Sequence, residues 1–328
     1  MKEIKSSDDI RETANAFRES RILLTAIELN IFSVLDKHMM TSEDVSEKIN
    51  ADAKATDRLM NALCSMGLLK KIKKRFYNSD IASKYLIKGN PDFMGNLYHS
   101  NNLWNSWSNL TESVKQGKSQ KPALTKEEKD DWTEAFIGAM HYRGVNQGKI
   151  TALMIDLSNI KTMLDVGGGS AAFSMEIVKR NPSINAVVLD LPSVIPLTKK
   201  YAAEAGLLDK FNFIEGNYLS TDFGCGYDLI LLSAIIHINS YEQNKTLIKK
   251  CADSLNKNGM IIISDFIMNE DRTKPYRGAL FSLNMLVGTA NGDTYTEQEI
   301  SEWFEAAGIS KIERKNTSFG SDLMIGFK

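Results

Sequence analysis

Cysteine is scarce in this chain of 328 residues, and its three copies lie far apart in the sequence. An odd number of widely spaced cysteines (Cys64, Cys225 and Cys251) argues against a disulfide framework and against a Cys-x-x-Cys metal site. We therefore expect no bound metal, and we expect three buried thiols in a protein of a reducing compartment.

Long apolar runs and an excess of charge of one sign are also missing. No run approaches the roughly 18 uncharged apolar residues that predict a membrane span, and Met1–Asp9 has no apolar stretch of the signal-peptide type. A formal net charge of −1 gives no global attraction to nucleic acid or anionic lipid. With 43% apolar and 25% charged residues, the chain is predicted to be a soluble cytoplasmic protein without nucleic-acid or membrane partners.

The first hundred residues favour short helices followed by a hairpin. Thr41 is a predicted N-cap of a helix over 42–48, a second helix is predicted over 56–66, and 68–77 reads as a basic two-stranded ribbon. The helix before them is indicated by apolar residues at helical spacing: Ile22, Leu23, Ala26, Ile27, Ile31 and Phe32. Two helices and a β-ribbon form a winged-helix pattern.

A winged helix taken alone suggests DNA binding. The second helix offers few side chains that suit base edges, namely Arg58, Asn61 and Ser65. The basic run in the ribbon is of a kind that usually forms a solvated edge. We therefore favour a packing or dimerisation module, with a winged-helix regulator as the alternative.

The second half alternates strands and helices, as a doubly wound α/β sheet requires. A polar loop is predicted over 116–131, followed by a helix that carries Trp132, Phe136 and Met140 on one face. The predicted strands are apolar runs typical of strands covered on both faces: 162–166, 186–189, 211–215, 227–232, 260–264 and 323–327. The predicted helices are 172–179, 194–205, 241–254 and 296–307.

The strongest motif is Met-Leu-Asp-Val-Gly-Gly-Gly-Ser-Ala, which follows a strand and precedes a helix. Glycines at 167 and 169 allow a tight turn and a close approach of the backbone to a ligand. Asp165 is placed to order this loop or to bind an ammonium group. A diphosphate-bearing cofactor is the rival interpretation, but the spacing differs from the Gly-x-Gly-x-x-Gly that such cofactors favour.

Two further strand ends carry polar residues. Asp190 ends the second strand, where a carboxylate can accept both hydroxyls of a ribose, and Leu191 follows it. After the third strand, Asn217 is placed to bond an adenine and Tyr218 to pack on its face. Because ligands of doubly wound sheets bind at the carboxyl ends of the strands, the sequence predicts a nucleoside-sized ligand here.

The order of motifs resembles one family over nearly the whole chain. The motifs are Leu-Asp-Val-Gly-Gly-Gly, Leu-Asp-Leu-Pro, Glu-Gly-Asn-Tyr, Leu-Leu-Ser-Ala-Ile-Ile-His and Asn-Gly-Met-Ile-Ile-Ile-Ser-Asp. They are similar to class I small-molecule O-methyltransferases of the plant phenylpropanoid and acetylserotonin type and their bacterial relatives. The resemblance implies S-adenosylmethionine as cofactor and a homodimer formed through the N-terminal domain. It implies a dimerisation domain over 1–100, a helical linker that contributes to the substrate pocket over 101–158, and a Rossmann-like catalytic domain over 159–328.

The resemblance also assigns roles to particular residues. Gly167, Asp190, Asn217, Tyr218 and Ser233 fall where family members contact the cofactor, with Asn217 in place of an acid and Ser233 in place of a basic residue. His237 aligns with the general base, and Asp265 with the acid that orients it. The usual His-Asp-Trp is His-Ile-Asn here, and a second family acid falls on Thr294.

The acceptor pocket is expected to be largely apolar. By resemblance, the substrate-facing residues are Phe136, Met140, His141, Phe281, Asn284 and Met285, whereas periodicity alone makes the apolar ones ordinary core. Asn284 lies in an apolar stretch, and a buried amide there needs a partner. The sequence thus predicts methyl transfer to a phenol or enol hydroxyl of a small apolar molecule. The alternatives are methylation of carbon or sulfur and a protein that binds the cofactor without turnover.

Overall fold

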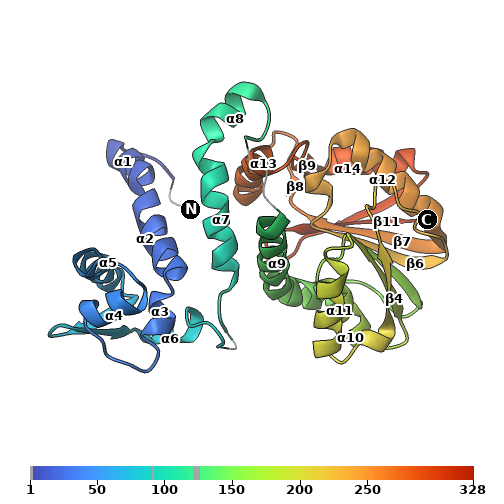
Figure 1. Cartoon of the computed structure of the whole chain (residues 1–328). Coiled ribbons are helices and arrows are strands. Elements are labelled where there is room, and N and C mark those ends of the chain that lie inside the picture. Colours follow the sequence, from blue (N-terminus) through green and yellow to red (C-terminus); the bar gives the residue numbers. More distant parts are fainter. Residues whose placement is uncertain (1–2, 91, 121–125) are drawn as a thin grey trace. The chain divides into compact units, whose positions relative to one another are not determined.

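The computed structural model describes residues 3–90, 92–120 and 126–328, and the chain divides into two compact units, Met1–Asn102 and Leu103–Lys328 (Figure 1). The boundary falls within helix α7 (Asn96–Ser108). Most of the range 101–158 therefore belongs to the second unit, and our three-part division of the chain stays a prediction.

The first unit consists of helices and one antiparallel hairpin, as the winged-helix pattern predicts. Its elements are α1 (Ser7–Asn15), α2 (Phe17–Glu28), α3 (Ile31–Val34), α4 (Ser42–Lys48), α5 (Ala53–Ser65), β1 (Leu69–Ile72), β2 (Arg75–Asn78) and α6 (Asp80–Tyr85). Phe32, Leu63 and Phe76 are fully buried at its centre. Burial of such side chains supplies about 1.5–3 kcal/mol each, which gives the unit a core of its own.

Two helix starts in this unit follow from capping residues. The Thr41 hydroxyl accepts the Asp44 N–H while the Asp44 carboxylate accepts the Thr41 N–H, so the predicted cap of α4 is confirmed as a capping box. The next helix, α5, begins three residues before the predicted start. The Asp52 carboxylate accepts the Ala55 N–H at 2.8 Å and so caps the helix earlier.

The second unit holds the remaining elements and confirms the predicted α/β class. Its helices are α8 (Leu110–Gln116), α9 (Lys126–Met154), α10 (Ala172–Arg180), α11 (Ile195–Glu204), η1 (Leu208–Lys210), η2 (Ile236–Ile238), α12 (Tyr241–Ser254), α13 (Tyr276–Gly288) and α14 (Glu297–Ala306). Its strands are β3 (Thr162–Val166), β4 (Asn185–Asp190), β5 (Phe211–Glu215), β6 (Tyr227–Ser233), β7 (Leu255–Asp265), β8 (Ile267–Met268), β9 (Tyr295–Thr296), β10 (Lys311–Lys315) and β11 (Asp322–Phe327).

Two predictions about these elements were wrong. The loop predicted up to residue 131 ends earlier, because α9 already begins at Lys126; residues 121–125 of that loop lie outside the described residues. The strand β10 was missed because its sequence, Lys-Ile-Glu-Arg-Lys, has a single apolar residue. It lies at the edge of the sheet, where polar side chains are common.

The main sheet has seven strands in the order β10-β11-β7-β6-β3-β4-β5. Its strands β7, β6, β3, β4 and β5 are parallel, whereas β11 is antiparallel to β7 and β10 is antiparallel to β11. The chain passes from β3 to β4 and β5 on one side and then to β6 and β7 on the other. The strand order therefore switches between β3 and β6, and doubly wound folds bind ligands at the carboxyl ends of the strands at such a point.

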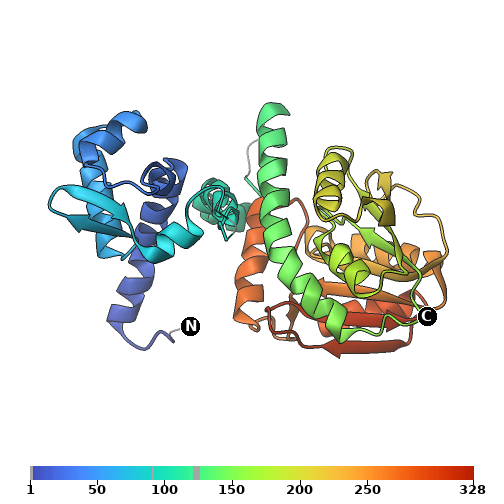
Figure 2. The same cartoon turned by 90° about the horizontal axis from the view of Figure 1, so that it is seen from below.

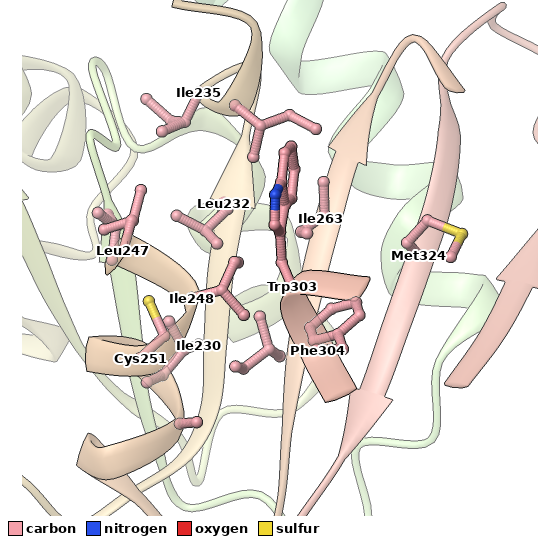
Figure 3. Packing of buried hydrophobic residues seen from close by; sticks show 14 of the residues in the cluster. Ile230, Leu232, Ile235, Leu247, Ile248, Cys251, Ile263, Trp303, Phe304 and Met324 are labelled. Carbon is pink, nitrogen blue, oxygen red and sulfur yellow. The ribbon is translucent and has the colours of Figure 1, made fainter. Parts of the chain in front are cut away.

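Helices cover both faces of the sheet (Figure 1). Helices α12 and α14 pack on one face, where Trp303 and Phe304 lie against Leu232 and Ile263 (Figure 3). Helices α10 and α11 and the end of α9 pack on the other face; Figure 2 shows α9 as the long green helix. Because both faces are buried, the strand ends are held in fixed positions relative to one another.

The cysteines differ from the expectation of three buried thiols. Cys251 is buried and Cys64 half-buried, but Cys225 is exposed in the turn before β6. Within the part of the chain that the structure describes, no helix combines the length and apolarity needed to cross a bilayer.

Candidate functional site

The glycine-rich loop connects β3 to α10 and adopts the conformation that its glycines predict. Gly167 and Gly169 have φ angles of +64° and +57°, in the left-handed region that favours glycine. A Cβ atom at Gly167 would lie 2.3 Å from Cδ1 of Ile235, so a side chain there would also require the Ile235 side chain to shift.

Asp165 lies beneath this loop and is 1% exposed. One carboxylate oxygen accepts the Ser174 hydroxyl at 2.5 Å, and the other is buried without a hydrogen-bond partner among the described residues. Burial raises the pKa of Asp165 from 3.8 to about 7, although the Ser174 hydroxyl lowers it and the Asp190 charge raises it further. A buried oxygen without a hydrogen bond destabilises the folded state by about 1–3 kcal/mol. A ligand bound at the loop would relieve this if it brought a hydrogen-bond donor or a positive charge to the oxygen.

Asp190 ends β4 beside the same loop. Its two carboxylate oxygens accept the backbone N–H groups of Gly169 at 2.8 Å and Leu191 at 2.7 Å. Burial raises the pKa of Asp190, while these two N–H groups lower it. Each oxygen keeps a second lone pair for a ribose hydroxyl, so the geometry is compatible with the predicted role. Leu191 is 47% exposed and lies at the rim.

The third strand end carries Asn217 and Tyr218. Asn217 is exposed, and its side-chain oxygen accepts the Leu219 N–H at 2.9 Å, which leaves its amide N–H₂ as the group for an adenine. Tyr218 lies close to Gly167, since a Cβ built there would be 3.7 Å from the Tyr218 ring. The structure thus brings the ring of Tyr218 and the glycine-rich loop together.

Ser233 is the last residue of β6 and is half-buried opposite Ser264 of β7. The next residue, Ala234, has a φ of +57° and is exposed, so the chain turns sharply there. This turn directs the chain into the short helix η2, which carries His237. No local pattern predicts this turn, because alanine rarely adopts the left-handed conformation.

His237 and Asp265 form a buried pair at the ends of β6 and β7. The Nδ1 atom of His237 lies 2.9 and 2.8 Å from the two carboxylate oxygens of Asp265, the first of which also accepts the Phe266 N–H. His237 is 9% exposed and Asp265 3% exposed. A carboxylate at Nδ1 favours the tautomer with the proton on Nδ1 and so leaves Nε2 as an acceptor. No described residue bonds Nε2.

Aromatic rings surround this pair on the side of α13. The ring of Phe281 stands at 87° to the His237 ring with 4.8 Å between centroids, and it also contacts Phe266. The sequence assigned Phe281 to the acceptor pocket; its ring lies beside His237, and that role stays a prediction. Aromatic walls exclude water from a proton-transfer group and suit an apolar acceptor.

The position of the second family acid has no carboxylate directed at His237. Thr294 is 2% exposed, and its carbonyl accepts an N–H of Arg272. The neighbouring Asp293 pairs with Arg272 at 3.5 Å instead. A Cβ at Gly292 would be 2.3 Å from the His237 carbonyl oxygen, so this segment supports the backbone of His237 rather than its ring.

A hydrogen-bonded network that the sequence reasoning missed joins the cofactor side to the base. The Tyr218 hydroxyl donates to the Asn239 side chain at 3.0 Å, and Asn239 donates to Asn244 at 3.0 Å. Asn244 in turn donates to the carbonyl of Ile236, the residue before His237, at 2.8 Å. Asn239 stands where the family usually has an aromatic residue. Its only signal in the sequence is an asparagine in an otherwise apolar segment.

Helix α9 lies against the glycine-rich loop. His141 bonds the Ser170 hydroxyl through Nδ1 at 3.0 Å and stacks on Tyr201 with ring centroids 4.0 Å apart. Burial lowers the pKa of His141. His141 is thus placed beside the loop, whereas the sequence assigned it to the acceptor pocket; that role stays a prediction. Phe136 stacks on Trp132 at 4.9 Å, and Met140 is half-buried.

Asn284 and Met285 lie on α13. The amide oxygen of Asn284 accepts the indole N–H of Trp107 at 2.9 Å, so the partner expected for this amide exists. Met285 is 6% exposed and borders a hollow of about 310 Å³ that Lys118, Ser240 and Thr289 also line. Among the described residues, no three His, Cys, Asp or Glu side chains are grouped so that they could hold a metal ion.

The switch in strand order, the glycine-rich loop and the acid at the end of β4 are features that nucleotide-binding α/β folds share. Comparison with known families agrees. The O-methyltransferase domain matches residues 107–310, and the O-methyltransferase dimerisation domain matches residues 11–89. The chain belongs to the O-methyltransferase family, whose members are enzymes that use S-adenosylmethionine.

Individual relatives cover nearly the whole chain. The chain is 28% identical over 309 residues to 3-hydroxy-5-methyl-1-naphthoate 3-O-methyltransferase of Streptomyces sahachiroi, covering 92% of this chain and 89% of the relative. It is 26% identical to acetylserotonin O-methyltransferase of Bos taurus, covering 97% of each. Human N-acetylserotonin methyltransferase, solved in complex with S-adenosylmethionine, has the same fold with a TM-score of 0.85 at 23% identity, covering 100% of this chain and 99% of that one.

Proposed function

We propose that this protein transfers the methyl group of S-adenosylmethionine to a phenol or enol hydroxyl of a small, largely apolar molecule, with His237 as general base. The observation that carries this proposal is the buried His237–Asp265 pair at the ends of β6 and β7, one strand away from the glycine-rich loop. A relative named as a naphthoate 3-O-methyltransferase supports a hydroxyl as the acceptor.

The cofactor side is formed by the three strand ends. Asp190 accepts the ribose hydroxyls, Tyr218 packs against the adenine, and the unpaired oxygen of Asp165 receives a donor from the ligand. The other residues that we assign to cofactor binding are Asn217, Leu191 and Ser233. The bound cofactor supplies an electrophilic methyl group on a sulfonium, whose leaving group is a neutral thioether.

The protein contributes positioning and one proton acceptor. Holding the two reactants in line supplies roughly 7–11 kcal/mol. A free phenol is a much weaker acid than an imidazolium ion, so Nε2 of His237 takes the hydroxyl proton only as the bond to the methyl group forms. Asp265 holds the ring and stabilises the imidazolium. The charge that the family's second acid supplies is missing at Thr294, so Asp265 alone performs this role.

Two variants test the assignment of the base. We expect His237→Ala to lower kcat about 10²–10⁴-fold while the affinity for S-adenosylhomocysteine stays within about twofold. Asp265→Asn keeps the size of the side chain but favours the wrong tautomer of His237, so we expect it to lower kcat as well. Transfer of labelled methyl to a library of phenols measures kcat, and calorimetry measures the affinity. Full activity of His237→Ala would refute the role of the base.

We also propose that the protein is cytoplasmic and forms a homodimer. The match of residues 11–89 to a dimerisation domain supports pairing through the first unit. The exposed basic side chains of β1 then form a solvated edge of the hairpin rather than a surface for DNA.

A further inference from the structure

The segment that carries His237 has few hydrogen bonds of its own. It leaves β6 through Ala234, whose φ of +57° lies in the left-handed region, and then forms the single turn η2. Two backbone bonds close this turn, donated by the N–H groups of Ile238 at 3.1 Å and Asn239 at 3.3 Å. A single helical turn has too few hydrogen bonds to be stable alone. The position of the base therefore depends on contacts from other elements.

Side chains of two other elements hold the backbone on either side of His237. Before it, the amide of Asn244 in α12 donates to the Ile236 carbonyl at 2.8 Å. After it, the hydroxyl of Tyr295 in β9 donates to the Asn239 carbonyl at 2.6 Å. Asn244, Tyr295 and Asn239 are 0%, 4% and 3% exposed, so these bonds are shielded from water.

A third contact reaches this segment from the cofactor side, and the direction of its hydrogen bonds is fixed by their chemistry. A carbonyl only accepts, so Asn244 turns its N–H₂ toward Ile236 and its oxygen toward Asn239. Asn239 then donates its own N–H₂ to Asn244 and presents its oxygen to Tyr218, whose hydroxyl donates at 3.0 Å. One chain of donors therefore runs from the Tyr218 hydroxyl to the residue before the base.

The backbone of Tyr218 is held independently of its hydroxyl. The ammonium group of Lys250, on α12, donates to the Tyr218 carbonyl at 2.9 Å and also to the Thr221 carbonyl. Loss of the hydroxyl alone therefore leaves the ring in place and removes one bond of the chain.

We propose that Asn239 and Asn244 are positioning residues, and that the Tyr218 hydroxyl acts through them to hold His237 when the cofactor is bound. This inference rests on the proposed function, in which adenine packs against the Tyr218 ring, and extends it. A ligand on the ring restrains the hydroxyl, so it stabilises the observed position of η2 more than a displaced one. A misplacement of about 1 Å can cost about 10²-fold in rate, so both asparagines matter although they act through the backbone of His237.

Hydrogen exchange tests the proposal without turnover. The probe is the segment 234–240, which contains the two bonded amides of η2, followed by mass spectrometry in the full chain with and without saturating S-adenosylhomocysteine. We expect the ligand to slow exchange of this segment at least about fivefold in the unmodified protein. In Tyr218→Phe the slowing falls below about twofold, while the affinity for S-adenosylhomocysteine stays within about threefold because the ring remains.

The same hydroxyl should affect turnover rather than cofactor binding. With a phenol that accepts labelled methyl, we expect Tyr218→Phe to lower kcat about tenfold and to leave KM for S-adenosylmethionine within about threefold. Because the hydroxyl acts through Asn239, the same substitution in Asn239→Ala should change kcat by less than about twofold. Additive losses would mean that the two groups act separately, which contradicts the proposal.

Tyr241→Phe is the matched control. Tyr241 begins the same helix, α12, but its hydroxyl bonds Glu302 of α14 at 2.7 Å. Its loss should leave both kcat and the slowing of exchange unchanged. Undiminished slowing in Tyr218→Phe, an equal loss in Tyr241→Phe, or binding of S-adenosylhomocysteine that does not slow exchange in the unmodified protein would overturn this inference alone. Absence of any S-adenosylhomocysteine binding is the separate result that refutes the proposed function and this inference with it.

Discussion

At the scale of single residues, Asp165 is a carboxyl group that the fold removes from water. Its pKa is raised to about 7 by burial, so the folded protein holds a proton that the unfolded chain releases near pH 4. Between these values the unfolded state binds fewer protons, and the stability contributed by this carboxyl falls as the pH rises. Above about pH 7 both states are ionised and the effect is constant.

We therefore expect the free energy of unfolding to decrease by roughly 2–3 kcal/mol from pH 5 to pH 8 through Asp165 alone. Urea denaturation of the cofactor-free protein at the two pH values measures this difference. Asp165→Asn removes the titration, so subtracting its profile isolates the contribution of the one carboxyl. Parallel profiles for the two proteins would mean that Asp165 is ionised throughout.

Several residues of the site were predictable because their chemistry follows from local sequence. Glycines 167 and 169 take positive φ angles, and Asp165 and Asp190 follow or end strands, so their positions were fixed once the strands were recognised. Contacts between distant segments were not predictable. Asn239 joins Tyr218 to Asn244, and His141 bonds Ser170; both depend on how α9, β5 and η2 pack, which no local pattern encodes. The exposure of Cys225 was not predictable either, because it also depends on how distant segments pack.

At the scale of elements, the contact between α9 and α10 depends on two glycines inside a helix. A Cβ at Gly148 would lie 2.8 Å from the Cα of Phe173, and one at Gly144 would lie 2.8 Å from the Cβ of Ala172. Alanine is ordinarily better than glycine inside a helix by about 1 kcal/mol. Here the close approach opposes that gain, because backbone atoms cannot move aside without separating the two helices.

We expect Gly148→Ala to destabilise the protein by about 1–3 kcal/mol through overpacking. Gly288 at the end of α13 is the matched control: it has no heavy atom within 4 Å of a Cβ and no positive φ. Gly288→Ala should be neutral or stabilising by up to about 1 kcal/mol. Urea denaturation of both variants measures the difference, and equal effects at the two positions would contradict the close packing of α9 on α10.

Most helices and strands of the second unit were predictable because buried strands show apolar runs in the sequence and half-buried helices show an amphipathic period. The wrong start of α9 and the missed strand β10 have local causes. The start of α9 lies in Lys-Glu-Glu-Lys, which is polar enough to resemble a loop, and β10 is an edge strand with one apolar residue. Hydrophobic patterning detects elements with a buried apolar face, and a polar edge strand such as β10 gives little of that signal.

At the scale of the whole molecule, the match to a dimerisation domain predicts a stable pair of chains. Light scattering coupled to size-exclusion chromatography should give twice the chain mass of 36.7 kDa at micromolar concentration. A mass of one chain would contradict the homodimer but leave the assignment of the catalytic unit unaffected, since all groups assigned to catalysis and to the cofactor lie in Leu103–Lys328.

The central claim is that the ends of β3, β4 and β5 hold an adenosyl ligand next to the His237–Asp265 pair. Calorimetric titration of S-adenosylhomocysteine into the folded protein tests it most directly, with Asp190→Ala as the comparison. We expect saturable binding at one site per chain, weakened at least about tenfold by Asp190→Ala because two ribose hydroxyls lose their acceptor. Absence of binding heat in the folded, unmodified protein, at more than one temperature, would contradict the account.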